Sequence, residues 1–64
     1  MIDAAYIRAR RESLRMTQVQ AAAIARVSPQ TWNRIEHGRG GNVTIKTIER
    51  LALSLNVKPQ RLVK

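Results

Sequence analysis

Apolar residues recur along this chain at the spacing of helices, and no stretch alternates with the period of two that a half-buried strand needs. The clearest apolar stripe predicts a helix over residues 44–55 and consists of Ile45, Ile48, Leu51, Ala52 and Leu55. A second helix is predicted over residues 4–14, where Ile7 and Leu14 share a face. The pattern therefore indicates an all-α fold.

Start and stop signals divide the remaining sequence into further helices. Thr17, with Gln20 three residues later, predicts a capping box at the start of a helix whose body, residues 19–25, is apolar nearly all round. We expect this helix to be the most buried one. Ser28 as N-cap and Pro29 at the first helical position begin the next helix.

The remaining caps and a short C-terminal helix complete the predicted fold. Asp3 is the expected N-cap of the first helix, Gly38 stops the third, and Asn56 stops the fourth in a left-handed conformation. A short fifth helix over residues 59–63 should turn Leu62 back onto the core. Sixty-four residues make one domain. We therefore expect a compact five-helix domain that spans residues 1–64.

The helix that follows Ser28 has two chemically different sides. At about 100° per residue, Trp32 and Ile35 fall on one side. The opposite side carries hydrogen-bonding groups and consists of Gln30, Asn33, Arg34 and His37. Gln and Asn pair bidentately with adenine, and Arg with guanine, in the DNA major groove. The pattern predicts that Gln30, Asn33 and Arg34 contact bases.

Charge and composition support a polyanionic partner. Twelve Lys and Arg residues stand against four Asp and Glu, giving a net charge of +8, which favours nucleic acid. Without cysteine and with one histidine, the chain offers no metal site, and we expect no cofactor. We see no nucleophile–base–acid set, and so expect no enzyme. The apolar run 19–25 is too short to span a membrane and no leader is visible, so we expect a cytoplasmic protein.

Residues spread over nearly the whole chain resemble the phage Cro/cI-repressor family, also called the XRE family. The resemblance is carried by an ordered set of short motifs: Thr17-Gln18, Arg34-Ile35-Glu36 followed by Gly38, and Leu55-Asn56-Val57. It implies a repressor-like domain in which the second and third helices form a helix-turn-helix. It also implies a sequence-specific regulator that binds a near-palindromic double-stranded DNA operator as a homodimer, associated with the nucleoid of a prokaryote or encoded by a phage.

The resemblance also implies roles for individual residues. Arg11 and Glu36 match an ion pair that ties the first helix to the third, and Gln18 matches a phosphate contact. The loop with Arg39 and Asn42 matches one that grips the sugar-phosphate backbone. We add three phosphate candidates around the third helix: Ser28, Thr31 and His37. Arg8, Arg10 and Arg15 are candidates to extend this phosphate-binding stripe. The dimer interface is expected near the C-terminus, at Leu53, Val57, Leu62 and Val63.

Two residues depart from the family pattern at turns. Arg26 and Arg15 stand where the family commonly has glycine. A residue other than glycine in the left-handed region costs about 1 kcal/mol. We therefore expect the turn at Arg26 to take another geometry.

Other functions remain open from the sequence. The same fold serves as an antitoxin, with a toxin as protein partner, or as a restriction–modification controller. A protein- or RNA-binding adaptor is an alternative of a different class, and a cationic membrane peptide is another. So small a domain leaves no room for ligand sensing, and we expect no small-molecule ligand.

Overall fold

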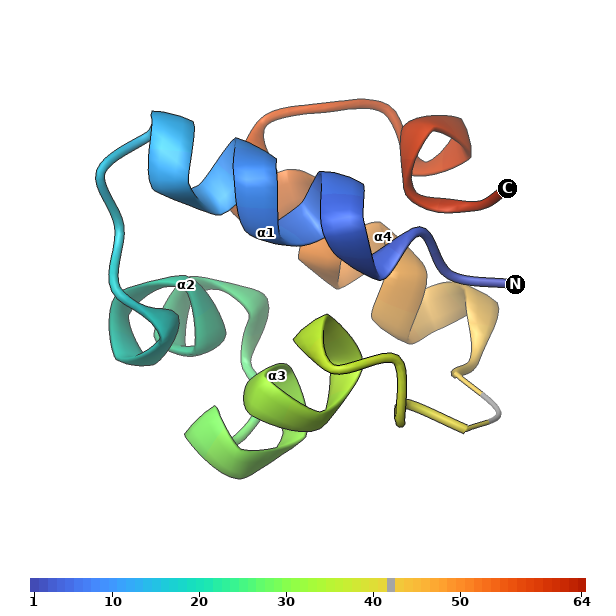
Figure 1. The fold of residues 1–64 in the computed structure, drawn as a ribbon, viewed down its shortest axis with the longest axis horizontal. Helices are drawn as coiled ribbons and strands as arrows, with labels where there is room; N and C mark the ends of the chain where they lie inside the picture. Colours follow the sequence, from blue (N-terminus) through green and yellow to red (C-terminus); the bar gives the residue numbers. More distant parts are fainter. Residues whose placement is uncertain (42) are drawn as a thin grey trace.

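The computed structural model describes residues 1–41 and 43–64 and shows an all-helical chain (Figure 1). The elements are, in order, α1 (Ala4–Ser13), α2 (Gln18–Ala25), α3 (Pro29–Glu36), α4 (Ile45–Leu55) and the 3-10 turn η1 (Pro59–Leu62). The expected fifth helix is thus a single 3-10 turn. Within these two ranges, β-structure is limited to one antiparallel bridge between Ile2 and Val63.

Each α-helix begins at a side-chain cap, and the first three are the caps expected from the sequence. The caps are Asp3, Thr17, Ser28 and Thr44. The capping box is complete, because Gln20 N donates to Thr17 Oγ1 at 3.0 Å and Thr17 N donates to Gln20 Oε1 at 2.9 Å. These bonds satisfy backbone donors that a helix leaves free in its first turn.

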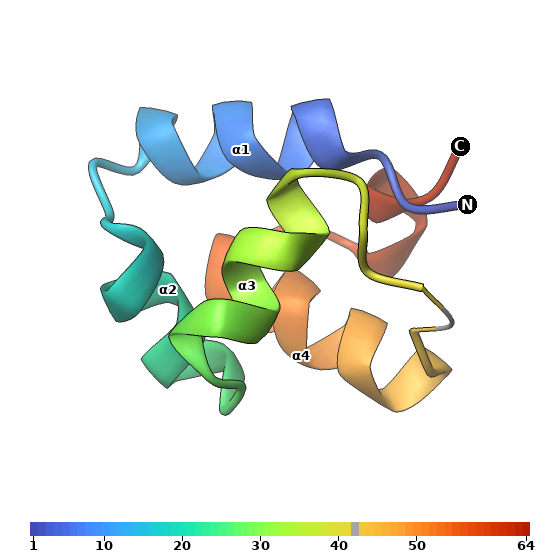
Figure 2. The same cartoon turned by 60° about the horizontal axis from the view of Figure 1, so that its bottom comes forward.

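The helices enclose one small core (Figures 1 and 2). Its largest fully buried side chains are Trp32, Ile7, Ile35, Leu51, Leu55 and Leu62. The buried Ser54 hydroxyl donates to the Ala21 carbonyl at 2.8 Å and links α4 to α2. The two termini lie side by side, since Asp3 N donates to Leu62 O at 2.7 Å.

The apolar pattern was wrong about the burial of some residues. Helix α2 is not buried all round, because Val19 is 61% exposed and Ile24 is 52% exposed. Ala21, Ala22 and Ala25 enter the core instead, which leaves the larger side chains facing solvent. Ile45 was expected on the inner stripe but is 77% exposed. It is the first residue of α4, beyond the part of the helix that the core covers. Leu14, expected beside Ile7, is partly exposed.

The expectation for the turn at Arg26 was also wrong. Arg26 adopts the left-handed conformation with φ 60° and ψ 42°, although it is not glycine. The conformation closes the end of α2, because Arg26 N donates to Ala23 O and Val27 N donates to Ala22 O. Satisfying these carbonyls and reversing the chain outweigh the local strain. Arg15 also has a positive φ, of 57°.

Candidate nucleic-acid interface

Helix α3 is oriented as the helical wheel predicts. Trp32 and Ile35 are buried, with exposed fractions of 0% and 2%. The hydrogen-bonding residues on its other side are all exposed: Gln30, Asn33, Arg34 and His37. In Figure 2 the helix lies in front, and no other helix covers it on that side. The predicted base-contacting side chains are therefore accessible to a large ligand.

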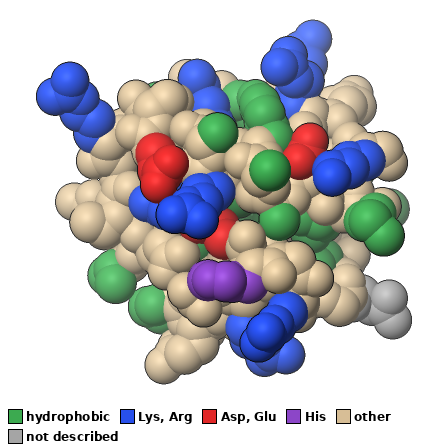
Figure 3. Space-filling model, in the orientation of Figure 1, with side chains coloured by type: hydrophobic (Ala, Val, Ile, Leu, Met, Phe, Trp, Pro, Cys, Tyr) green, Lys and Arg blue, Asp and Glu red, His purple; other side chains and the backbone are tan. Residues whose placement is uncertain are grey.

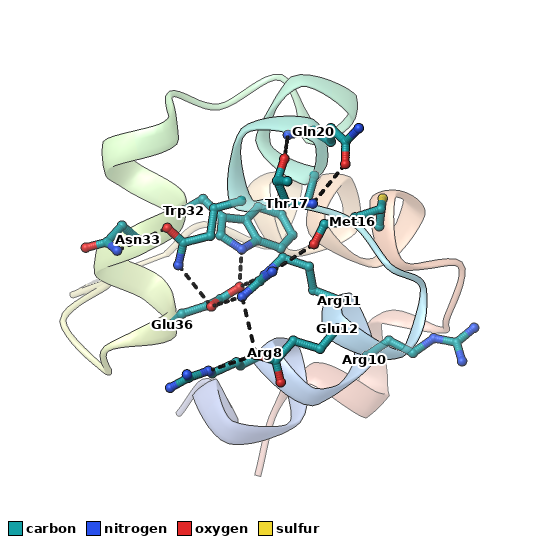
Figure 4. Close-up of polar contacts among 12 residues, drawn as sticks. Arg8, Arg10, Arg11, Glu12, Met16, Thr17, Gln20, Trp32, Asn33 and Glu36 are labelled. Atoms are coloured by element: carbon teal, nitrogen blue, oxygen red, sulfur yellow. Dashed lines mark hydrogen bonds and ion pairs between the residues drawn. The ribbon is translucent and has the colours of Figure 1, made fainter.

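A buried carboxylate fixes α3 against α1. Arg11 donates to Glu36 through two nitrogens, with Nε 2.5 Å from Oε2 and Nη2 3.0 Å from Oε1. The Glu36 side chain is only 2% exposed. The indole nitrogen of Trp32 donates to the same Oε2 (Figure 4). Such two-pronged, charge-assisted pairs are geometrically specific, so Glu36 holds the rotation of α3 about its axis.

These contacts shift two ionisation equilibria. Burial by itself would raise the pKa of Glu36, but hydrogen bonds from Arg11, Trp32 and Gln18 outweigh it. The pKa of Glu36 therefore lies below its ordinary value. The hydrogen bond to Glu36 raises the pKa of Arg11. The carboxylate is thus ionised at neutral pH.

Gln18 joins this carboxylate to the exposed side of α3. Its Nε2 donates to Glu36 Oε1 at 3.1 Å, and its Oε1 accepts from Asn33 Nδ2 at 3.1 Å. The structure thereby brings together a predicted phosphate contact and a predicted base contact, which sequence reasoning kept separate. The sequence pattern alone also did not reveal Trp32 as a hydrogen-bond partner of Glu36. The four-residue spacing of these two residues was the available signal, because a buried indole N–H needs an acceptor.

The phosphate candidates around α3 make local hydrogen bonds. Ser28 Oγ accepts from Thr31 N at 3.1 Å and donates to Thr31 Oγ1 at 2.9 Å. His37 Nδ1 lies 2.7 Å from the carbonyl oxygen of Asn33, which only accepts, so Nδ1 carries the proton. The other ring nitrogen, Nε2, donates a hydrogen bond only in the doubly protonated ring, so a contact from His37 to a phosphate requires that form. Asn42, another candidate, lies outside the described residues.

Comparison with known families assigns the chain to a family of domains. Residues 4–63 match the family described as "Helix-turn-helix domain". The chain belongs to this family. No curated protein and no solved structure gives a significant match. Membership of this family supports DNA binding by the domain and a function in the regulation of transcription.

The loop that follows α3 packs closely in this helix-turn-helix domain. Gly38 reverses the chain with φ +73°. At Gly40 a Cβ atom would lie 3.1 Å from Ile35 Cγ1, so the loop approaches α3 closely and a larger residue would press on the Ile35 side chain. A hollow of about 200 Å³ lies beside Arg34, between α3 and the start of α4. Arg39 lies between Gly38 and Gly40. Its backbone N donates to Arg34 O at 2.8 Å, and its side chain is exposed.

Figure 3 shows several basic side chains on one face of the domain. Their roles differ. Arg8 pairs with Glu12 at 3.4 Å with both side chains largely exposed. Arg10 donates from Nε to the carbonyl of Leu55 at 3.0 Å. Of the candidate stripe Arg8, Arg10 and Arg15, the structure thus gives Arg10 a contact inside the fold.

The expected dimer residues do not form one exposed patch. Leu53 is 75% exposed and Val63 is 41% exposed, whereas Val57 is partly buried. Leu62 is fully buried in the core. Its assignment to the interface was wrong, because η1 turns this side chain inward as the sequence predicts.

The helices described in residues 1–41 and 43–64 were also compared with the requirements of a membrane span. None of them combines the length and the apolar character that spanning a bilayer requires.

Proposed function

We propose that this domain is a sequence-specific regulator of transcription that binds double-stranded DNA, of the Cro/cI type that its motifs resemble. In this proposal α2 and α3 are the two helices of the motif, and α3 enters the major groove. The supporting observation is the division of α3 into a buried side with Trp32 and an exposed side with Asn33 and Arg34. That division presents groups able to read base edges.

The proposed interface makes two kinds of contact with DNA, one to the bases and one to the sugar-phosphate backbone. Gln30, Asn33 and Arg34 read base edges, while contacts to the backbone fix the register of the domain on the duplex. The proposed backbone contacts are Gln18, Ser28, Thr31, His37, Arg39 and Asn42. The net charge of +8 supplies affinity that does not depend on sequence. Gln18 takes part in this proposal with its second N–H, because its first already binds Glu36.

The proposal extends to a homodimer of single-domain chains. Two copies of α3 would enter successive major grooves about 34–36 Å apart on a near-palindromic operator. The exposed Leu53 and Val63 support a contact between copies near the C-terminus. Binding over a promoter would repress transcription in the cytoplasm of a prokaryote.

Selection of duplexes from a random DNA pool tests this function. We expect enrichment of one near-palindromic site, and anisotropy titration at physiological salt should show at least about 10³-fold tighter binding than to a shuffled duplex. Equal affinity for the two duplexes would reject the proposal. A preference for RNA over every selected duplex would favour the adaptor function instead.

A further inference from the structure

We propose that Gln18 is a positioning residue that sets which atom Asn33 presents to a base. In this arrangement Asn33 Oδ1 faces outward as an acceptor and recognises the exocyclic amino group of adenine or cytosine. The inference rests on the proposed function, since it names the base chemistry that α3 selects. It follows from the direction of three consecutive hydrogen bonds.

The first step is the orientation of the Gln18 amide. An ionised carboxylate only accepts hydrogen bonds, and Glu36 is ionised beside Arg11. The Gln18 atom 3.1 Å from Glu36 Oε1 must therefore be the amide nitrogen, as the structure has it. The reversed amide would place two oxygens against each other next to a buried charge.

The second step passes this orientation to α3. With its nitrogen bound to Glu36, Gln18 turns its Oε1 to Asn33, whose Nδ2 donates at 3.1 Å. Reversing the Asn33 amide would again bring two oxygens together. Among the hydrogen bonds of residues 1–41 and 43–64, none involves Asn33 Oδ1, and the residue is exposed. The free acceptor therefore belongs to the surface that faces a partner.

The third step is the base that fits a fixed acceptor. In the major groove, adenine N6 and cytosine N4 donate hydrogen bonds, while guanine O6 and N7 and thymine O4 accept. A fixed oxygen attracts the first pair and repels the second. An asparagine free to reverse its amide would satisfy either kind of base. Gln18 thus turns an ambiguous side chain into a selective one.

Competition between operator variants tests this on the intact domain. Loss of discrimination in Asn33→Ala identifies the base pair that Asn33 reads. Each pair holds one base with an exocyclic amino group, adenine or cytosine, and we expect that amino group to be the contact. Replacing that base by purine or 2-pyrimidinone, which lack the amino group, should weaken binding about three- to tenfold. In Gln18→Met the same replacement should change affinity less than about twofold. The matched control Gln30→Met should change preference at a different base pair.

The two proposals fail separately. If no duplex is preferred to a shuffled one, the proposed function fails. If a site is selected but removing the amino group at that base pair leaves binding unchanged, or if Gln18→Met keeps full discrimination, only the orienting role of Gln18 is overturned.

A second measurement does not depend on how well the variant folds. In the native protein, the side-chain NH₂ protons of Gln18 and Asn33 should exchange slowly with water, and rotation about their amide C–N bonds should be slowed. Nuclear Overhauser effects should connect the two NH₂ groups. The Gln18 amide shift should also follow the titration of Glu36. The amide of Gln60, exposed on η1, is the control. If the side-chain amides of Gln18 and Asn33 exchanged and rotated as fast as that of Gln60, the inference would be overturned.

Discussion

Arg10 on α1 donates from Nε to the main-chain carbonyl of Leu55, the last residue of α4, at 3.0 Å. The last carbonyls of a helix lack partners inside it and carry partial negative charge. The guanidinium therefore closes α4 and joins the two helices. From its charge and position on α1, Arg10 had been a candidate for phosphate binding.

The first prediction compares Arg10 with its neighbour Arg8. Arg10→Met keeps much of the apolar stem but removes the donor, and should lower the free energy of unfolding by about 1–2 kcal/mol. Arg8→Met removes only an exposed pair with Glu12, and should cost less than about 1 kcal/mol. Urea unfolding of both variants measures the difference. Equal losses would contradict a structural role for Arg10.

The second prediction concerns acid and Glu36. Its pKa is lower in the folded protein than the ordinary value of 4.5. The stability that this group contributes is therefore fully present above pH 4.5 and is lost as pH falls through the folded pKa. The carboxyl carbon of Glu36 should titrate in NMR with a midpoint below 4.5, and urea stability should fall over the same range. A midpoint at or above the ordinary value would contradict this account.

Glu36→Gln provides the matching variant. Removing one partner of a buried ion pair leaves Arg11 without its counter-charge and costs about 3–5 kcal/mol. The exposed Glu12 is the control, since Glu12→Gln should change the melting temperature little. A melting temperature of Glu36→Gln close to that of Glu12→Gln would show that the pair is not needed for the fold.

Local chemistry in the sequence predicted the boundaries of the four α-helices. Caps such as Thr17 and the two-sided composition around Trp32 depend on neighbours within one helix, so sequence spacing reveals them. The contacts of Gln18 with Glu36 and Asn33 depend on the angle between α2 and α3, which no local pattern encodes. The burial of α2 was misjudged for the same reason, because all-round apolar spacing does not say which side faces the core.

The third prediction uses the strained turn after α2. Arg26 has φ 60°, a conformation that glycine adopts without steric cost. Arg26→Gly should therefore raise the free energy of unfolding by about 1 kcal/mol. Arg26→Ala removes the same charge but keeps Cβ, so it should bring no such gain. Thermal unfolding of the pair measures the effect, and equal stability of the glycine and alanine variants would contradict it.

The fourth prediction separates base reading from backbone binding. Arg34 lies on the exposed side of α3, and Arg39 lies on the loop after it. Arg34→Ala should cost about 1–3 kcal/mol on the selected operator and relax preference at one base pair. Arg39→Ala should weaken operator and shuffled duplexes alike, and should reduce the salt slope of log K by about 1. Anisotropy titrations of both duplexes at several salt concentrations distinguish the two patterns. If Arg34→Ala weakened both duplexes equally, Arg34 would be a backbone contact, and the choice of sequence would have to rest on Gln30 and Asn33.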